Sequence, residues 1–175
     1  MSRAMAHKNK QRQVRLTAEW MAQQYPQGGY TLNAYLGPAL DGLVEEKGLE
    51  RALRESAPWR PRVDALVEES GRLVLVEAEI RQPRNAVGNL LVYRNLVDTT
   101  PELRAYWGRP TGMVLLMPWT NATIDAMART AGIRVEIYNP PWIAEYVAEL
   151  GVYWTREYQE RRQQKLALRQ LLGVE

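Results

Sequence analysis

The sequence contains no cysteine and no phenylalanine, and its only histidine is His7, in the polar N-terminal segment. Without cysteine, disulfides, thiolate zinc sites and cysteine nucleophiles are excluded. Because no histidine follows His7, a histidine-dependent serine relay and a histidine-rich zinc site inside the fold are excluded as well. None of the three serines, at positions 2, 56 and 70, lies in a glycine-flanked nucleophile elbow. Any catalysis must therefore depend on carboxylates with a hard metal ion, or on arginine, lysine and tyrosine.

Long apolar runs are also missing. No stretch reaches the roughly 18 residues that span a bilayer, and no apolar signal segment follows the basic N-terminus. We therefore expect a cytoplasmic protein without a membrane partner. At 175 residues, with 46% hydrophobic and 25% charged side chains, the chain has the size and composition of one globular domain.

The net charge of +3 is unevenly distributed along the chain. Residues 1–15 carry five basic side chains and no acid, residues 154–175 have a net charge of +2, and the remainder is acidic, at −4. A basic arm is the usual electrostatic footprint of phosphate-backbone binding, but a solubilising disordered tail has the same composition. The acidic middle argues against a protein that coats nucleic acid with its whole surface.

Hydrophobic periodicity and turn residues predict an alternating order of elements. The helices are expected over 16–24 (N-capped by Thr17), 40–56, 86–98, from a cap at Thr120 or Asn121 to residue 129, 142–149 and 153–172; the strands over 30–36, 63–68, 73–80, 113–117 and 133–138. A tight turn at Ser70-Gly71 joins the second and third strands as a hairpin. This order predicts an α/β fold with a mixed central sheet of about five strands flanked by helices. We expect a flexible basic arm over 1–15, the α/β domain over 16–152 and a C-terminal helix over 153–175.

Three acidic residues lie on the predicted hairpin. Side chains alternate along a strand, so Glu77 and Glu79 share one face of the third strand. Asp64, on the second strand, lies at a similar distance from the turn and should come close to Glu77. Three carboxylates at one place repel one another unless a cation joins them, and a hard divalent ion, Mg²⁺ or Mn²⁺, is the natural occupant.

A second interpretation of these acids is structural. In it they lie at strand ends, solvated or paired with Arg81 and Arg84. The apolar residues upstream on both faces of the third strand favour the metal site, because a carboxylate buried without a partner is costly.

The same segment resembles the signature of the PD-(D/E)XK nuclease superfamily. The resemblance consists of Arg62-Val63-Asp64, a hairpin, and then Glu77-Ala78-Glu79. The helix over 86–94 is similar to the segment that follows the motif in many members, with Asn89 where glutamine is common and Tyr93 where tyrosine is. With the strand over 133–138, the resemblance covers roughly residues 16–140. Two departures stand out: Val63 replaces the motif proline, and Glu79 replaces the motif lysine.

The resemblance implies a restriction-endonuclease-like fold and Mg²⁺- or Mn²⁺-dependent hydrolysis of DNA phosphodiester bonds. Asp64 and Glu77 would hold the metal, and Glu79 would orient or deprotonate the attacking water or join a second metal. Arg81 or Arg84 would stabilise the charge of the transition state.

Two residues of the following helix would complete such a site. Asn89 and Tyr93, one turn apart, would order water or a substrate phosphate, although the same spacing also fits a helix face that only touches solvent. The six tryptophans are expected mostly in the core, which has no phenylalanine to fill it, rather than stacked on bases.

The replaced lysine leaves a second function open. Some restriction enzymes of the superfamily carry glutamate at this position and remain active, whereas other members have become inactive. The alternative is therefore a catalytically inactive nuclease-fold protein that binds DNA or serves as a structural or assembly component, for example of a phage or mobile element. A transcriptional regulator is a weaker interpretation, since no helix-turn-helix pattern is present. The C-terminal helix would dock on the domain, contact DNA or pair with another subunit as a homo-oligomer.

Overall fold

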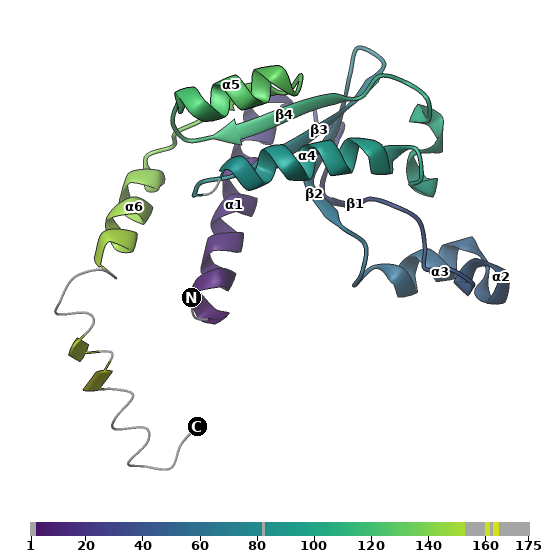
Figure 1. Ribbon diagram of the computed structural model, residues 1–175, viewed down its shortest axis with the longest axis horizontal. Helices are drawn as coiled ribbons and strands as arrows, with labels where there is room; N and C mark the ends of the chain where they lie inside the picture. The colour runs from purple at the N-terminus through teal and green to yellow at the C-terminus, as the bar shows by residue number, and fades with distance from the viewer. Residues whose placement is uncertain (1–2, 82, 153–159, 162, 165–175) are drawn as a thin grey trace. The chain divides into compact units, whose positions relative to one another are not determined.

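The computed structural model describes residues 3–81, 83–152, 160–161 and 163–164 (Figure 1). The chain divides into two compact units, residues 1–138 and 139–175. The first unit contains, in chain order, α1 (Arg3–Gln24), β1 (Tyr30–Tyr35), α2 (Leu43–Lys47), α3 (Leu49–Ser56), β2 (Arg62–Glu69), β3 (Arg72–Ala78), α4 (Pro83–Val97), the 3₁₀ helix η1 (Pro101–Tyr106), β4 (Gly112–Met117), α5 (Ala122–Thr130) and β5 (Arg134–Ile137).

The second unit begins with α6 (Trp142–Val152). The division between the units therefore falls before α6, whereas we expected the α/β domain to extend to residue 152. Most of the expected C-terminal helix over 153–175 lies outside the described residues. In the described ranges, no helix is both long enough and apolar enough to span a bilayer.

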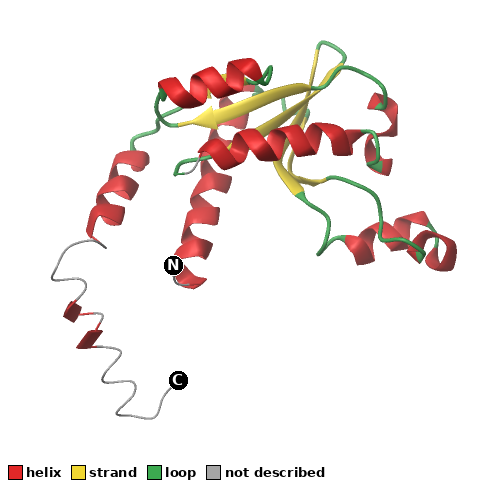
Figure 2. Ribbon diagram, viewed as in Figure 1, coloured by secondary structure: helices red, strands yellow, loops and turns green. Residues whose placement is uncertain are grey.

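The five strands form one mixed sheet in the order β1-β2-β3-β4-β5 (Figure 2). Antiparallel pairing joins β1, β2 and β3, and parallel pairing joins β3, β4 and β5. The predicted α/β fold class, with about five strands and flanking helices, is confirmed. So is the hairpin turn: Ser70 and Gly71 both adopt positive φ, of 50° and 79°, as a two-residue turn between right-twisted strands requires.

Helices cover β3 on both of its faces. α4 packs against β3 and β4, α5 packs against α4 and β5, and α1 packs against β2 and β3. Figure 2 shows α4 in front of the sheet and α1 behind it. Leu75 and Leu115 join the core under α4, and every residue of β3 from Leu73 to Ala78 is buried. This double coverage explains why β3 and β4 read as continuous apolar runs.

The first helix is longer than the sequence analysis predicted. It begins at Arg3 rather than at residue 16, so most of the expected flexible arm is helical. Thr17 is therefore not an N-cap; its Oγ1 donates a hydrogen bond to the Gln13 carbonyl one turn earlier, at 3.0 Å. The physical reason is composition, because residues 3–15 contain neither glycine nor proline and are rich in alanine, lysine, arginine and glutamine, which favour helix.

The helix predicted over 40–56 is divided in two. Gly48 adopts a φ of 76°, a conformation that a helix cannot contain, and it separates α2 from α3.

The expectation for the tryptophans is wrong for most of those described. Trp20 is buried, but Trp59, Trp107 and Trp119 are 68%, 41% and 42% exposed. Aliphatic side chains fill the core around the sheet instead.

The cap of α5 is Asn121, one of the two candidates that the sequence offered. Its side-chain oxygen accepts the backbone N–H groups of Thr123 and Ile124, both at 3.1 Å. We expect Asn121→Ala to lower the free energy of unfolding by about 1 kcal/mol, because two N–H groups of the first turn lose their acceptor. Urea denaturation followed by circular dichroism measures this change. Asn121→Ser, which keeps an acceptor oxygen, should remain close to the parent protein, and an equal loss in both variants would contradict the capping role.

Candidate functional site

Asp64 lies where the β2–β3 hairpin opens. The paired register ends at Ala65 and Val76, and one further step places Asp64 opposite Glu77. Asp64 Oδ2 accepts the backbone N–H of Ala78 at 2.9 Å. The carboxylate therefore takes a hydrogen bond that a neighbouring strand would otherwise accept, and it is held against the end of β3 by the main chain.

Glu77 is the buried acid of the site. The residue is 8% exposed, and its Oε1 accepts a hydrogen bond from Asn89 Nδ2 at 3.2 Å. Its other oxygen, Oε2, is buried and has no hydrogen-bond partner in the described part of the chain. Burial raises the pKa of Glu77 to about 8, and the charge of Asp64 and, more weakly, that of Glu79 act in the same direction. Without a cation, this carboxyl is therefore mostly protonated at neutral pH.

Glu79 and Arg81 form the turn that leaves β3. The backbone N–H of Glu79 donates to the Leu116 carbonyl at 2.9 Å, which continues the pairing with β4. The Glu79 side chain turns back, and its Oε1 accepts the backbone N–H of Arg81 at 2.8 Å. Arg81 Nη1 is buried and finds no hydrogen-bond partner within the described residues. Glu79 thus contributes negative charge near Glu77 while its carboxylate is bonded within its own turn.

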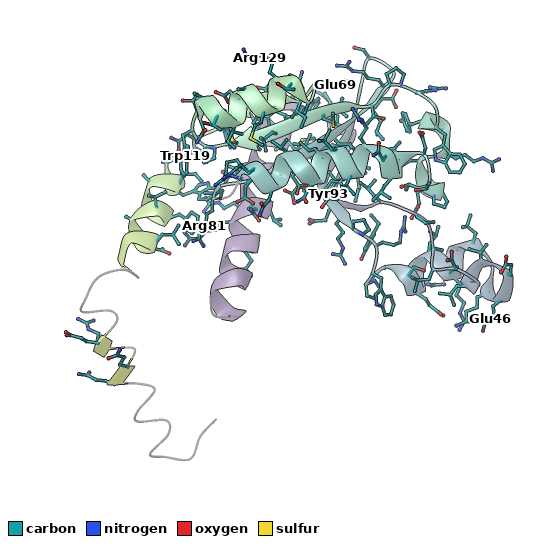
Figure 3. The ribbon with its side chains drawn as sticks, viewed as in Figure 1. Glu46, Glu69, Arg81, Tyr93, Trp119 and Arg129 are labelled. Atoms are coloured by element: carbon teal, nitrogen blue, oxygen red, sulfur yellow. The ribbon has the colours of Figure 1, made fainter. Side chains whose placement is uncertain are left out.

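The predicted alternative, in which the arginines neutralise the acids, has only limited support. Among the described residues, no ion pair joins Glu77 or Glu79 to Arg81 or Arg84. Arg84 lies in the first turn of α4 and is exposed. Arg81 is half-buried in the loop that precedes α4 (Figure 3). Within the described residues, neither arginine therefore neutralises Glu77 or Glu79 through an ion pair.

α4 brings Asn89 and Tyr93 to the acids. The helix begins at Pro83, a residue favoured in the first turn, and buries Ala86 and Leu90 against the sheet. Asn89 is bonded to Glu77 as described. Burial raises the pKa of the half-buried Tyr93 to about 12, and the charges of Glu77 and Asp64 act in the same direction, so the phenol lies within the field of both acids. The helix face that carries both residues is thus turned to the acids and not only to solvent.

The structure brings together a pair of acids rather than the expected trio. In the ranges that the structure describes, no group of three or more histidine, aspartate and glutamate side chains is arranged to hold a metal ion. Glu79 is kept out of such a group by its bond to the Arg81 N–H. The Asp64–Glu77 pair with its unbonded buried Oε2 nevertheless suits a hard divalent ion, which takes oxygen ligands and completes its shell with water.

Neither a protein-family model nor a curated protein sequence matches the chain. Two solved structures share part of its architecture. One is a repair endonuclease from Pyrococcus abyssi, with 15% identity and a TM-score of 0.42 over 72% of this chain and 46% of that one. The other is the EndoMS–dsDNA2 complex, with 16% identity and a TM-score of 0.42 over 72% of this chain and 44% of that one. The chain thus corresponds to less than half of either protein, and a likeness at this level defines neither its family nor its activity.

Two residues beside the acids were not assigned to the site from the sequence. Arg62 lies two positions before Asp64 and so on the same face of β2. Asn33 of β1 lies between the pairs Leu32–Ala65 and Ala34–Val63, and therefore opposite Asp64, with a φ of 52°. Strand alternation alone would have found Arg62. Asn33 could not have been found in this way, because its place depends on the pairing of β1 with β2.

The raised pKa of Glu77 gives the free energy of unfolding a specific pH dependence. The folded state binds the Glu77 proton more tightly than the unfolded state, so this contribution to stability is complete below the unfolded pKa of 4.5 and is lost as the pH rises through about 8. Glu77→Gln removes the effect. In EDTA, the variant should match the parent near pH 5 and exceed it by a few kcal/mol near pH 9, since one pKa unit corresponds to about 1.4 kcal/mol.

Urea unfolding at these two pH values checks the expectation. Glu50→Gln, on an exposed surface of α3, controls for the loss of one negative charge. A difference between Glu77→Gln and the parent that stays constant with pH would show that the Glu77 carboxyl does not titrate in this range.

Proposed function

We propose that this protein is a divalent-metal-dependent endonuclease that hydrolyses DNA phosphodiester bonds at the Asp64–Glu77 pair. The observation that carries the proposal is Glu77 Oε2, buried without a hydrogen-bond partner in the described residues and close to a second carboxylate. Such an arrangement costs stability when it stays empty of cations, and groups with strongly shifted pKa values gather at functional sites. Mg²⁺ or Mn²⁺ between these oxygens would remove the cost.

Each residue near the pair has a role in this proposal. Asp64 and Glu77 would hold the ion, with Asp64 fixed by the Ala78 N–H and Glu77 by Asn89. The bound ion would supply Lewis-acid polarisation of a phosphoryl oxygen and a more acidic water. The Tyr93 hydroxyl would donate a hydrogen bond to a substrate oxygen or to an ordered water.

The cations of the site would meet the negative charge of the phosphate. Arg81 Nη1, buried and without a bonded acceptor in the described residues, is suited to a phosphate oxygen, and charge-assisted bonds of this kind are strong. Exposed Arg84 at the start of α4 would bind the same strand of DNA. The five basic residues of positions 1–15 lie in α1. They would add the electrostatic attraction that nucleic-acid binding requires.

The direct test is cleavage of supercoiled plasmid DNA. We expect nicking in Mg²⁺ or Mn²⁺ that EDTA abolishes. Asp64→Asn and Glu77→Gln, which keep the shape of the side chains, should each lower the rate at least about 100-fold. Binding of Mn²⁺, followed by electron paramagnetic resonance, should weaken in the same two variants. Glu50→Gln serves as the matched control; cleavage that survives in Glu77→Gln would overturn the proposed site.

A second candidate is a catalytically inactive nuclease-fold protein that binds DNA or serves as an assembly component. The observation in its favour is Glu79, which stands where the resemblance expects lysine and whose carboxylate is bonded to the Arg81 N–H. In this candidate Asp64 and Glu77 are retained without a catalytic role, and the protein acts by binding DNA or another protein through its surface.

Glu79→Gln separates the two candidates. The amide oxygen of glutamine can still accept the Arg81 N–H, so the free energy of unfolding should change by less than about 0.5 kcal/mol or rise as one charge near Glu77 disappears. If Glu79 orients or deprotonates water, cleavage should fall about 10²- to 10⁴-fold in this stable variant. The inactive candidate instead predicts no metal-dependent cleavage by either protein, with DNA binding unchanged. Plasmid nicking and urea unfolding of the same preparations give both readouts.

A further inference from the structure

An arginine fixed on a tyrosine ring lies next to the acid pair. Arg62, the first residue of β2, pairs with Tyr35, the last residue of β1. Its guanidinium carbon lies 4.3 Å from the centre of the Tyr35 ring, and its Nη2 donates a hydrogen bond to the Tyr35 hydroxyl at 2.5 Å. Stacking and a hydrogen bond together hold the guanidinium in one orientation.

Apart from its contacts with Tyr35, the guanidinium of Arg62 has no hydrogen-bond or ion-pair partner in the described residues. The residue is exposed, and no carboxylate of the described residues forms an ion pair with it. Within those residues, only Nη2 has a hydrogen-bond acceptor, and one of its two N–H groups serves it. The other Nη2 N–H remains available to a ligand together with Nη1 and Nε. Arg62 thus presents a fixed positive charge with unused donors to solvent.

Arg60, the other arginine beside Tyr35, provides the contrast. It is 7% exposed, its Nη1 and Nη2 bind both oxygens of Glu102 at 2.7 and 2.8 Å, and its Nε donates to the Gly37 carbonyl at 3.1 Å. Its guanidinium carbon is 5.6 Å from the centre of the Tyr35 ring. Each of its three guanidinium nitrogens is therefore bonded to the protein, and Arg60 serves to attach η1 to the loop after β1.

The position of Arg62 relative to Asp64 suggests what it binds. Two residues along a strand span about 7 Å and point to the same face. One strand of DNA advances about 3.4 Å per phosphate along the helix axis, so this distance corresponds to one or two nucleotides. A strand whose phosphate lies at the Asp64–Glu77 pair would therefore bring a neighbouring phosphate to Arg62.

We propose that Arg62, held by Tyr35, binds the phosphate that flanks the one at the acid pair and so sets the register of the nucleic-acid strand. This inference rests on the proposed function in taking nucleic acid as the ligand and in placing one of its phosphates at the acid pair. Guanidinium matches phosphate with two parallel hydrogen bonds, and a side chain that is ordered before binding loses little entropy when the ligand arrives. Tyr35 acts as a positioning residue, because it touches the arginine and not the phosphate.

The test measures binding of a short DNA duplex in EDTA, without cleavage, at several salt concentrations. Arg62→Gln should weaken binding about fivefold or more near 0.1 M salt and reduce the slope of log affinity against log salt by about one. Arg62→Lys keeps the charge but not the planar fork, so it should recover the slope and only part of the affinity. Tyr35→Phe keeps the ring but not the hydroxyl. We expect it to lower the affinity for DNA about two- to threefold, with the same slope of log affinity against log salt as the parent.

Arg54→Gln is the matched control, because Arg54 is exposed on α3, away from the acids. It should bind DNA within about twofold of the parent with the same salt slope. Circular dichroism and the urea midpoint confirm folding of each variant. The inference is overturned if Arg62→Gln binds like the parent, if Arg54→Gln loses as much, or if the parent does not bind DNA.

The outcomes separate this inference from the proposed function. If the parent cleaves DNA with metal and Arg62→Gln binds DNA as tightly as the parent, the proposed enzyme is supported and the contact between Arg62 and the flanking phosphate is excluded. Binding that depends on Arg62, in a protein that cleaves nothing, would support the contact and favour the inactive nuclease fold.

Discussion

The burial of one carboxyl group beside another dominates the electrostatics of this domain. Glu77 lies at the end of β3, a strand covered on both faces, with one oxygen bonded to Asn89 and the other without a partner in the described residues. Desolvation and the charge of Asp64 both favour the protonated form. A core that needed only packing would place an apolar residue here, at lower free energy. The arrangement therefore costs stability that an apolar side chain would not cost, and the proposed cation would remove that cost.

The fold keeps this pair in place through a change in strand pairing. β3 is antiparallel to β2 and parallel to β4, and its end is where β2 separates while β4 continues. Asp64 bonds to the Ala78 N–H that this separation leaves open, and Glu79 N–H remains bonded to β4. A main-chain N–H thus fixes Asp64, and a side-chain hydrogen bond from Asn89 of α4 fixes Glu77.

Much of this arrangement follows from local sequence signals. The alternation around Asp64 and Glu77, the Ser70-Gly71 turn and the spacing of Asn89 and Tyr93 predict the hairpin, the closeness of two acids and the helix that covers them. These features depend on contacts between near neighbours in the chain or on one strong turn. The start of α1 was missed because a polar, charged stretch has no apolar period, although its residues favour helix.

Other features do not follow from strand alternation or from the turn residues. Strand alternation predicts that Glu79 shares a face with Glu77. In the structure, the Glu79 carboxylate instead accepts the Arg81 N–H in the turn after β3 and does not join the expected cluster of three acids. The pairing of Tyr35 with Arg62 needs the register of β1 against β2. The tryptophans were expected in the core because the chain has no phenylalanine, but several of them, such as Trp59, are exposed. The absence of phenylalanine does not decide which aromatic side chains are buried.

The raised pKa of Glu77 would link pH to binding of the proposed cation in a definite direction. A divalent ion needs the ionised carboxylate, so its binding would release the proton that burial retains, and its affinity would rise with pH through the range near 8. The unused donors of Arg81 and Arg62 have the opposite need, because each is satisfied by an anion. An ion at the acids and a phosphate strand across the arginines would neutralise both halves together, whereas either alone leaves charge uncompensated. Under the proposed function, cation and strand binding would therefore be cooperative on electrostatic grounds.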